Sequence, residues 1–373
     1  MKIVFVGGIS IPSQGGIENY VLNLAKQLRD MGHEIWIICR GDANKDFVLN
    51  DIHISQIYCK ENALSILVLN IFASLLIFKN SKGINVVNYQ SIYLPFLYEW
   101  IPKLKKIFVV HTQHSFAQDN PKYSTLQKTF IRILYRISGL VFSPIITVSE
   151  YNRKLIKMRF KKNATVINCG VNLPQYQVMS RILESNNINK GRYYLTIGRI
   201  DPIKNLHILI KGFMKRTRSD DVQLVICGDM DNSYGEELKS LASMNDRIVF
   251  TGVVCGDDKY ALLSNCLAYC LVSSSEGFPI ALLEAMSYGN VCICSSIPAC
   301  MEVLPQSMGL WCSPNDEFSI SKRMDELETS PERYIDYGKR AQKLIANNLT
   351  WSQIANLYIT YIQAKVKDSV SVK

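Results

Sequence analysis

The sequence predicts an α/β protein made of two doubly wound domains. Short apolar runs of strand length alternate with segments whose apolar residues recur at helical spacing, over residues 2–148 and again over 193–295. Strands that alternate with helices indicate parallel sheets built from βαβ crossovers. The chain has 373 residues, which is too long for one ordinary core. We therefore expect two layered domains, each around a parallel sheet.

In the first half, residues 2–6 form an apolar run that ends in Gly7 and Gly8, which is typical of a strand followed by a turn. Residues 18–31 carry apolar side chains at helical spacing, and Gly32 provides a stop. Further strands are predicted over residues 33–39, 84–88, 107–110 and 145–148.

Residues 64–78 (LSILVLNIFASLLIF) are almost wholly apolar but number only fifteen. A helix that crosses a bilayer needs about 20 such residues. We expect a buried helix here, with insertion into a membrane interface as the alternative.

The polar stretch 174–192 has no sustained periodicity and is interpreted as a linker. The pattern then restarts, with strands predicted over 193–197, 222–227, 248–251, 268–271 and 291–295 and helices over 206–214, 259–264 and 280–288. The domains predicted are residues 1–173, a linker of 174–192, residues 193–350 and a C-terminal amphipathic helix within 351–373 that crosses back to the first domain.

The net charge of +10 is unevenly distributed. Between residues 101 and 163 thirteen Lys and Arg residues face only two acidic ones, Asp119 and Glu150. Such a field is typical of a protein with an anionic partner. A solvated surface without any partner is an equally good explanation. No nucleic-acid motif accompanies the charge, so we expect no nucleic acid as partner. Within 122–142, Lys122, Lys128, Arg132 and Arg136 alternate with apolar residues, which predicts a basic amphipathic helix suited to an anionic leaflet, or an ordinary packed helix.

The eleven cysteines form no CxxC pair and no zinc-ligand spacing with the five histidines. Several lie inside apolar runs, which suits buried thiols in a reducing cytoplasm. We expect no metal site and no disulfide framework.

The first candidate site follows the first strand, in GGISIPSQGGIENY. Gly15 and Gly16 directly precede the predicted helix, where glycine allows close backbone approach and the helix N-terminus offers N–H groups to a phosphate. The dinucleotide fingerprint needs G-x-G-x-x-G and an acidic residue after the next strand, whereas Arg40 stands there, so a dehydrogenase is disfavoured. Turn geometry alone is the alternative explanation.

The strongest signal is SSSEGFPIALLEAMSYG in the second half. Glu276 falls in a loop, Pro279 suits the first turn of a helix, and Glu284 lies inside that helix. Backbone N–H groups near Phe278 and Ile280 would face an anion. One carboxylate on the loop and one on the helix can bracket a polyol, although an amphipathic helix with an acidic start is the simpler alternative.

The segment GRIDPIKN places Arg199 and Lys204 in one loop after the strand 193–197. Ligands bind at this edge of parallel sheets, and two cations there suit a diphosphate leaving group; surface charge is the alternative. Asp229 and Asp231 form a DxD sequence, which we interpret as a loop cap because it follows a strand and a glycine.

Together these segments resemble glycosyltransferase family 4, a retaining, bacterial surface-polysaccharide type of enzyme with the GT-B fold, in which two Rossmann-like domains face a central cleft. The E-x7-E segment is the most specific match, and the Gly-Gly-Ile-Glu turn, the G-R-x-x-x-x-K-N loop and the Ile-Thr-Val-Ser-Glu segment at 146–150 also agree. Where the family often reads P-N-G-V-D, residues 168–172 read N-C-G-V-N.

The resemblance implies a role for each matching position. Arg199 and Lys204 would bind the nucleotide diphosphate, Glu284 the ribose and Glu276 the donor sugar. Residues Gly277, Phe278, Pro279 and Ile280 belong to the same donor-binding segment, Val253 would pack on the nucleobase, and Gly15 and Gly16 would lie against the donor phosphates.

The family also has a histidine at the end of a first-domain strand, and VVHTQHS offers His111 and His114. We favour His114 because His111 falls within the predicted strand. A histidine there would hydrogen-bond the donor sugar near its anomeric carbon. His111 and His114 could instead hold a metal ion, but the sequence offers no third ligand nearby.

The predicted activity is retaining transfer of a sugar from a nucleotide-diphosphate sugar, UDP first and GDP second, without a cofactor or metal, by an enzyme of the EC 2.4 class. We expect a glycan or lipid-diphosphate-linked acceptor in O-antigen or lipopolysaccharide synthesis, and a cytoplasmic protein held peripherally at the inner face of the plasma membrane. The alternatives are a nucleotide-sugar epimerase or hydrolase of the same fold and a catalytically silent subunit of a polysaccharide-assembly complex.

Overall fold

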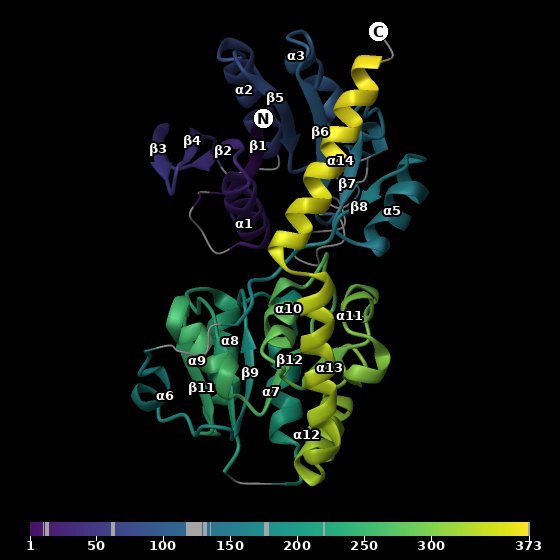
Figure 1. The fold of residues 1–373 in the computed structure, drawn as a ribbon. Helices are drawn as coiled ribbons and strands as arrows, with labels where there is room; N and C mark the ends of the chain where they lie inside the picture. The colour runs from purple at the N-terminus through teal and green to yellow at the C-terminus, as the bar shows by residue number, and fades with distance from the viewer. Residues whose placement is uncertain are drawn as a thin grey trace. The chain divides into compact units, whose positions relative to one another are not determined.

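The computed structural model describes residues 1–9, 11, 15–60, 64–116, 129, 133–134, 136–174, 179–218 and 221–371. The chain divides into two compact units. The first is built from the described residues up to Gly170 together with the C-terminal helix from Trp351, and the second from residues 171–350. Each unit is a parallel sheet with helices packed on its faces (Figure 1).

The sheet of the first unit has the order β3-β4-β2-β1-β5-β6-β7-β8, and all its neighbours pair in parallel except β3 with β4. Its strands are β1 (Lys2–Ile9), β2 (Glu34–Gly41), β3 (Lys45–Leu49), β4 (Ile52–Tyr58), β5 (Ile84–Tyr89), β6 (Phe108–Gln113), β7 (Ile145–Thr147) and β8 (Thr165–Val166). The sequence analysis predicted five of these strands and missed β3, β4 and β8, of which β3 and β8 are short edge strands.

Helices of the first unit are α1 (Gly16–Asp30), α2 (Ser65–Lys79), the 3-10 turn η1 (Pro95–Leu97), α3 (Trp100–Lys103), α5 (Glu150–Phe160) and α14 (Trp351–Ser371). Helix α1 buries Val21, Leu24 and Leu28. It ends before Gly32, whose positive φ of 82° is readily adopted only by glycine. Helix α14 packs against α1, and the backbone of Trp351 lies so close to Gly170 that a Cβ there would be 2.7 Å from the Trp351 Cα.

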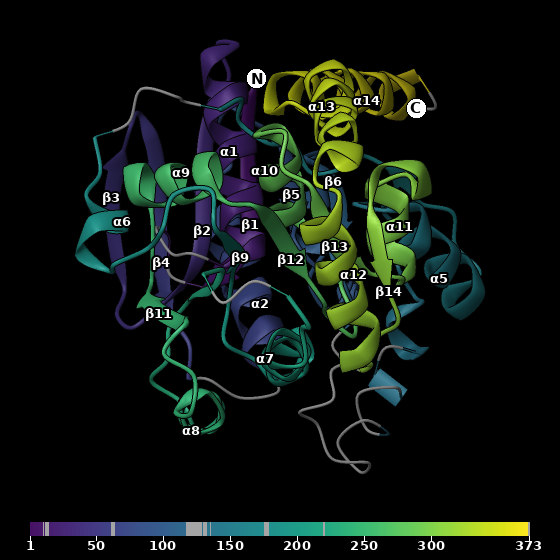
Figure 2. The same cartoon turned by 90° about the horizontal axis from the view of Figure 1, so that it is seen from below.

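The sheet of the second unit has the order β11-β10-β9-β12-β13-β14 and is parallel throughout (Figure 2). Its strands are β9 (Tyr193–Ile197), β10 (Gln223–Cys227), β11 (Ile248–Gly252), β12 (Ala268–Leu271), β13 (Cys292–Ser295) and β14 (Leu310–Cys312). Its helices are α6 (Ile182–Ser185), η3 (Pro202–Lys204), α7 (Leu206–Met214), α8 (Ser233–Ala242), α9 (Gly256–Asn265), α10 (Ile280–Ser287), α11 (Pro298–Val303), η4 (Gln306–Met308), α12 (Glu317–Thr329) and α13 (Glu332–Asn348).

Each sheet has one point where the strand order reverses. In the second sheet the chain runs outward from β9 through β10 to β11, then returns beside β9 and runs outward again through β12, β13 and β14. In the first sheet the same reversal lies between β1 and β5. Loops leaving neighbouring strands in opposite directions open a crevice at such a point, and ligands of open α/β sheets bind there.

Residues 174–192, which we interpreted as a linker, belong to the second unit as far as the structure describes them. It contains α6, and Ile188 is buried. The Gln223 side chain accepts a hydrogen bond from the Asn189 N–H and donates one to the Asn187 carbonyl. Further hydrogen bonds from Ser180 to Asp258 and from the Gly191 N–H to the Asn265 carbonyl fasten this stretch, and helical or strand periodicity gives no sign of such contacts.

The prediction of a buried helix at 64–78 was wrong for one face of α2. The buried side includes Asn70 and Ser74, whereas Phe72 and Leu75 are 54% and 51% exposed. No helix among the described residues is long and apolar enough to cross a membrane. Of the predicted basic helix over 122–142, Lys122, Lys128 and Arg132 lie outside the described residues, as does Asp119.

Tyr358 of α14 gives a test of how this helix is attached to the first sheet. The Asn88 side chain, fully buried in β5, donates to the Tyr358 hydroxyl at 2.9 Å and accepts from the Thr112 hydroxyl at 2.9 Å. Tyr358→Phe leaves the buried amide without its acceptor, and we expect it to lower the free energy of unfolding by about 1–2 kcal/mol.

The measurement is urea denaturation followed by tryptophan fluorescence in a Trp311→Phe background. Trp36, Trp100 and Trp351 then all report the first unit. Tyr361→Phe, on the same helix but partly exposed, is the control and should change stability by less than about 0.5 kcal/mol. Equal effects of the two substitutions would contradict the assigned role of the Asn88–Tyr358 bond.

Candidate functional site

The loop after β9 is shaped by its own side chains. Asp201 accepts a hydrogen bond from the Ile203 N–H at 3.0 Å and so caps the short turn η3. Asn205 then adopts a left-handed conformation, φ 53°, and its side chain donates to the Val272 carbonyl at 3.1 Å. The loop is therefore tied to the end of β12, and its two cations, Arg199 and Lys204, stand at the reversal point of the sheet.

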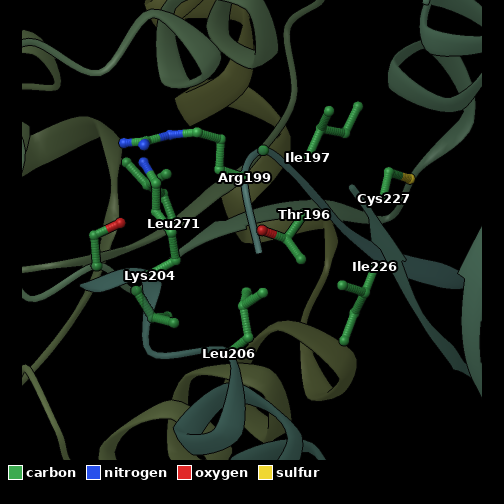
Figure 3. A pocket seen from close by; sticks show the side chains of 11 residues that line it. Thr196, Ile197, Arg199, Lys204, Leu206, Ile226, Cys227 and Leu271 are labelled. Atoms are coloured by element: carbon green, nitrogen blue, oxygen red, sulfur yellow. The ribbon is translucent and has the colours of Figure 1, made fainter. Parts of the chain in front are cut away.

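A small pocket opens between these loops (Figure 3). It is lined by residues from the carboxyl ends of β9, β10 and β12, among them Thr196, Gly198 and Ser273 together with Arg199 and Lys204. In Figure 3 the nitrogen-bearing ends of Arg199 and Lys204 lie on the same side of the pocket. Two cations with this placement can hold a diphosphate.

Glu276 meets Lys204 from the loop that follows β12. One carboxylate oxygen, Oε1, accepts from Lys204 Nζ at 2.6 Å and from the Ser273 hydroxyl at 2.7 Å. The side chains of Lys204 and Glu276 are 21% and 12% exposed. The pair is mostly buried, so the cost of desolvating two charges offsets much of their attraction, and its main consequence is to hold both side chains in one place.

Helix α10 begins directly after this loop. Pro279 is buried and occupies the position before the first helical residue, Ile280, and no side chain caps the helix start. The first backbone N–H groups of a helix have no partner within it and carry a partial positive charge. With Gly277 and Phe278 in the preceding loop, the segment offers amides to an anion beside Lys204 and Glu276.

Glu284 lies inside α10 and pairs with Lys259 of α9, Nζ to Oε1 at 2.8 Å. The sequence analysis missed Lys259, because its helix gives no sign of contact with a residue 25 positions away. Val253 follows Gly252, whose φ is 74°, and the Val253 side chain is 53% exposed. An exposed apolar side chain beside a glycine turn can pack on a planar ring.

The DxD sequence forms a loop cap, as predicted. The Asp229 carboxylate accepts from the Asp231 N–H at 3.0 Å, and the Asn232 side chain caps α8 by accepting from the Gly235 N–H at 2.9 Å. Among the described residues no group of three or more His, Cys, Asp and Glu side chains could hold a metal ion.

The glycine turns of the first unit are packed from both sides. Gly7 has φ 136°, and a Cβ on it would be 2.7 Å from the Gln90 Cβ. A Cβ on Gly15 would lie 1.9 Å from the carboxylate of Glu18, which is buried in the first turn of α1. The Cβ side of Gly16 is open. A phosphate against Gly15 would therefore meet a carboxylate to which the sequence analysis gave no role, whereas Gly16 is free of this conflict.

His114 follows the last residue of β6 and is fixed on three sides. Its Nε2 lies 2.9 Å from the Gln90 Oε1, its carbonyl accepts from the Asn152 side chain at 2.7 Å, and the Tyr20 ring stands edge-on at 4.7 Å. Burial lowers the pKa of His114 to about 4, so the imidazole is neutral at pH 7.

His111 lies within β6 and has no exposed surface. Its Nε2 is 3.0 Å from the Glu99 carboxylate and its Nδ1 is 2.9 Å from the Ser91 carbonyl. Burial alone would raise the pKa of Glu99, but the hydrogen bond and charge of His111 lower it to about 2. This pair belongs to the core, so His111 cannot reach a ligand without disrupting it.

The depressed pKa of His114 predicts its titration. Below pH 6.5 an unfolded histidine binds a proton, whereas folded His114 does not until about pH 4, so this residue makes the folded state less stable as the pH falls through that window. NMR of the histidine ring nitrogens, assigned with a His114→Gln variant, should show a neutral ring at pH 5.5 and a midpoint near 4. A midpoint near 6.5 would contradict the burial described.

The comparisons with known proteins agree with this architecture. Residues 14–175 match the model described as Glycosyltransferase Family 4, and residues 179–344 match the one described as Glycosyl transferases group 1. The O-antigen chain mannosyltransferase RfbU of Salmonella typhimurium is 29% identical over 213 residues, which cover 56% of this chain and 58% of that protein. The match therefore spans little more than half of that relative's length.

A longer match is the GDP-mannose:cellobiosyl-diphosphopolyprenol alpha-mannosyltransferase of Xanthomonas oryzae, 23% identical over 378 residues and 96% of each chain. Among solved structures, Anabaena HepE in complex with UDP and glucose superposes with a TM-score of 0.78 at 16% identity, covering 98% of this chain and 100% of that one. The fold is GT-B, with two Rossmann-like units. With its two halves matching the two models, the chain belongs to glycosyltransferase family 4, a family of glycosyl-transferring enzymes.

Proposed function

We propose that this protein transfers a sugar, with retention of anomeric configuration, from a nucleotide-diphosphate sugar to a glycan or lipid-linked acceptor in cell-surface polysaccharide synthesis. The observation that carries the proposal is the group formed by Arg199, Lys204 and Glu276 at the reversal point of the second sheet. It stands beside a helix start that no side chain caps.

The leaving diphosphate accounts for the cations. Negative charge grows on the diphosphate oxygens as the bond to the sugar breaks, and donors that are already in place lower the energy of that state. Arg199 and Lys204 supply two such donors, and the amides at the start of α10 supply more. This set stabilises the charge with the protein's own groups, and we propose that no metal or cofactor takes part.

Glu276 and Glu284 account for the hydroxyl groups of the donor. Glu276 is held by Lys204 and Ser273, and as a carboxylate it accepts hydrogen bonds from the hydroxyls of the transferred sugar. Glu284 would accept from the ribose hydroxyls while Lys259 orients it. Val253 would pack on the nucleobase.

His114 is the first unit's contribution to the reaction in this proposal. A neutral imidazole in contact with Gln90 can hydrogen-bond a sugar hydroxyl without placing a fixed positive charge beside an anomeric carbon that itself becomes positive. The depressed pKa therefore suits this role. Gly16, with its open Cβ side, suits close approach of the donor better than Gly15.

The donor and acceptor are proposed from the relatives. RfbU is named an O-antigen chain mannosyltransferase, and the Xanthomonas enzyme is named for GDP-mannose and a diphosphopolyprenol-linked acceptor. These names favour GDP-mannose over the UDP-sugar that the sequence analysis ranked first, and they favour a lipid-diphosphate-linked acceptor. We propose that the enzyme works on such an acceptor at the cytoplasmic face of the membrane that holds it.

A panel of nucleotide sugars tests the donor. In thermal-shift measurements we expect GDP and GDP-mannose to raise the melting temperature more than UDP and UDP-glucose, because a ligand stabilises the state that binds it. Lys204→Ala should abolish the shift, whereas Lys215→Ala, at a surface lysine 40% exposed, should keep it. A larger response to UDP compounds would reverse the proposed base preference, and no response to any of them would reject donor binding.

Substitutions in the group test the activity. Lys204→Ala removes charge stabilisation that strengthens in the transition state, and we expect it to lower the transfer rate by about 10²–10³-fold. Glu284→Ala should mainly weaken donor binding. The assay follows labelled mannose from GDP-mannose onto polyprenyl-diphosphate-linked oligosaccharides, with circular dichroism to confirm folding.

Glu236→Ala is the matched acidic control, since this carboxylate is 68% exposed on α8. Unchanged transfer by Lys204→Ala and Glu284→Ala would remove both residues from the site. Donor turnover that needs no acceptor would favour the epimerase or hydrolase alternative, and donor binding without turnover would favour a silent subunit.

A further inference from the structure

Helix α2 buries Leu69, Ala73 and Ile77 in the core, as an ordinary surface helix does, but it buries its serine and asparagine side chains there as well. Its polar side chains point inward, where the Ser74 hydroxyl donates to the Asn70 carbonyl at 2.6 Å and lies 2.5 Å from the Tyr89 hydroxyl. Asn70 and Ser74 are 1% and 0% exposed. A surface helix normally places such groups in water and its apolar stripe on the core. The Asn70 side-chain amide lies 3.5 Å from the Ser91 hydroxyl, so both buried side chains have polar partners and the arrangement is not a packing fault.

The outward side of α2 is apolar for most of its length. Phe72, Leu75 and Phe78 are 54%, 51% and 36% exposed, and Leu64, just before the helix, is 44% exposed. Phe72, Leu75 and Phe78 recur every three positions and therefore line one face. Three large apolar side chains in one stripe are more than the scattered exposed residues of an ordinary soluble surface.

The short helix α3 extends this surface. Helices α2 and α3 are in contact and lie side by side in the first unit (Figure 1). Trp100 and Leu104 are 52% and 64% exposed. The Lys105 ammonium lies over the Phe78 ring, 4.5 Å from its centroid, which joins the two helices at the surface. We define Phe72, Leu75, Phe78, Trp100 and Leu104 as the apolar docking face.

The segment that carries this face is rich in lysine and has no exposed acidic residue, although Lys103 Nζ lies 3.6 Å from the buried Glu99 carboxylate. Residues 64–108 contain five basic side chains, Lys79, Lys82, Lys103, Lys105 and Lys106. The one acidic residue in that range is Glu99, which is 1% exposed and bound to His111. An apolar centre with a cationic rim is complementary to a layer that is apolar inside and anionic at its surface.

We propose that the apolar docking face seats the first unit on the surface of an anionic lipid bilayer, with the rings of Phe72, Phe78 and Trp100 among the acyl chains and the lysines at the headgroups. Helix α2 has fifteen residues, about 22 Å, and is too short to span a hydrocarbon core of about 30 Å, so it lies in the interface. A second copy is a poorer occupant, because a two-fold contact through this face brings ten lysines of like charge together.

This inference rests on the proposed function and extends it, because an enzyme that acts on a lipid-linked acceptor must work at a membrane surface. It is nevertheless tested without donor or acceptor. Co-sedimentation with vesicles of phosphatidylglycerol and phosphatidylcholine at low salt measures binding by the full chain. We expect wild-type protein to bind these vesicles, to bind pure phosphatidylcholine at least about tenfold more weakly, and to lose affinity as salt is raised.

Two variants address the two halves of the face. Phe72→Gln/Leu75→Gln/Phe78→Gln removes the apolar stripe with a residue that keeps helix propensity, and Lys105→Glu/Lys106→Glu reverses two rim charges. Each should weaken partitioning by about tenfold or more. The matched controls are Val48→Gln/Met158→Gln, at residues 67% and 61% exposed on β3 and α5, and Lys154→Glu/Lys157→Glu on α5. Both controls should bind like wild type.

The fluorescence of Trp100 tests independently whether this face is the one that meets the vesicle. Trp36 and Trp351 are buried and Trp311 is partly buried, so Trp100 dominates any change in tryptophan environment. Vesicles should shift the emission to shorter wavelength, and Trp100→Phe should remove the shift while sedimentation is retained. An unshifted emission with bound protein would mean that another surface binds.

Absence of wild-type binding to anionic vesicles at low salt would overturn the proposal, as would unchanged binding by both variants. Light scattering adds a further check, since a wild-type dimer that the stripe variant dissociates would assign the face to a second copy.

Thermal shift with GDP-mannose separates this inference from the proposed function. Variants that lose vesicles but keep the donor response support the docking face, whereas failure of the donor response in wild type concerns the enzyme alone.

Discussion

The reversal of strand order between β9 and β12 is the constraint on which the candidate site depends. Both strands end at the same edge of a parallel sheet, so the loops that follow them meet although 72 residues separate Lys204 from Glu276. Asn205 fastens one loop to the end of the other strand through the Val272 carbonyl. The ion pair that results is mostly buried, and the cost of desolvating its charges offsets much of their attraction. Its value is positional, since a charge-stabilising site works only if its donors are in place before the charge appears.

The first unit uses the same topology with a different electrostatic character. Its reversal lies between β1 and β5, where Gln90, directly after β5, packs against Gly7 of β1 and contacts His114, which follows β6. The second unit gathers cations at this point. The first unit instead presents His114, whose pKa is lowered to about 4 by burial, and the buried carboxylate of Glu18. In the function we propose, the diphosphate accordingly binds the second unit and neutral hydroxyl groups contact the first.

Helix α2 shows how composition can mislead. Its fifteen residues are so apolar that burial is the natural prediction, because hydropathy averages over all faces of a helix. The few polar residues carry the information, since the side chains of Asn70 and Ser74 lie beside Ser91 and Tyr89 in the interior. Once they turn inward, geometry forces Phe72 and Leu75 outward. The same helix therefore combines a satisfied polar contact with the core and an apolar surface that water does not favour.

The sequence by itself determined what local patterns can carry. Strand and helix periodicity located most elements of both sheets, and the spacing of Glu276 and Glu284 around Pro279 predicted a loop carboxylate, a helix start and a helical carboxylate, as the structure has them. The tertiary structure alone decided the partners. Lys259 with Glu284, Glu18 against Gly15 and His111 with Glu99 join residues through packing that no periodicity records. The physical reason is that backbone propensity and hydrophobic spacing act over a few residues, whereas contacts at a sheet edge are set by strand order.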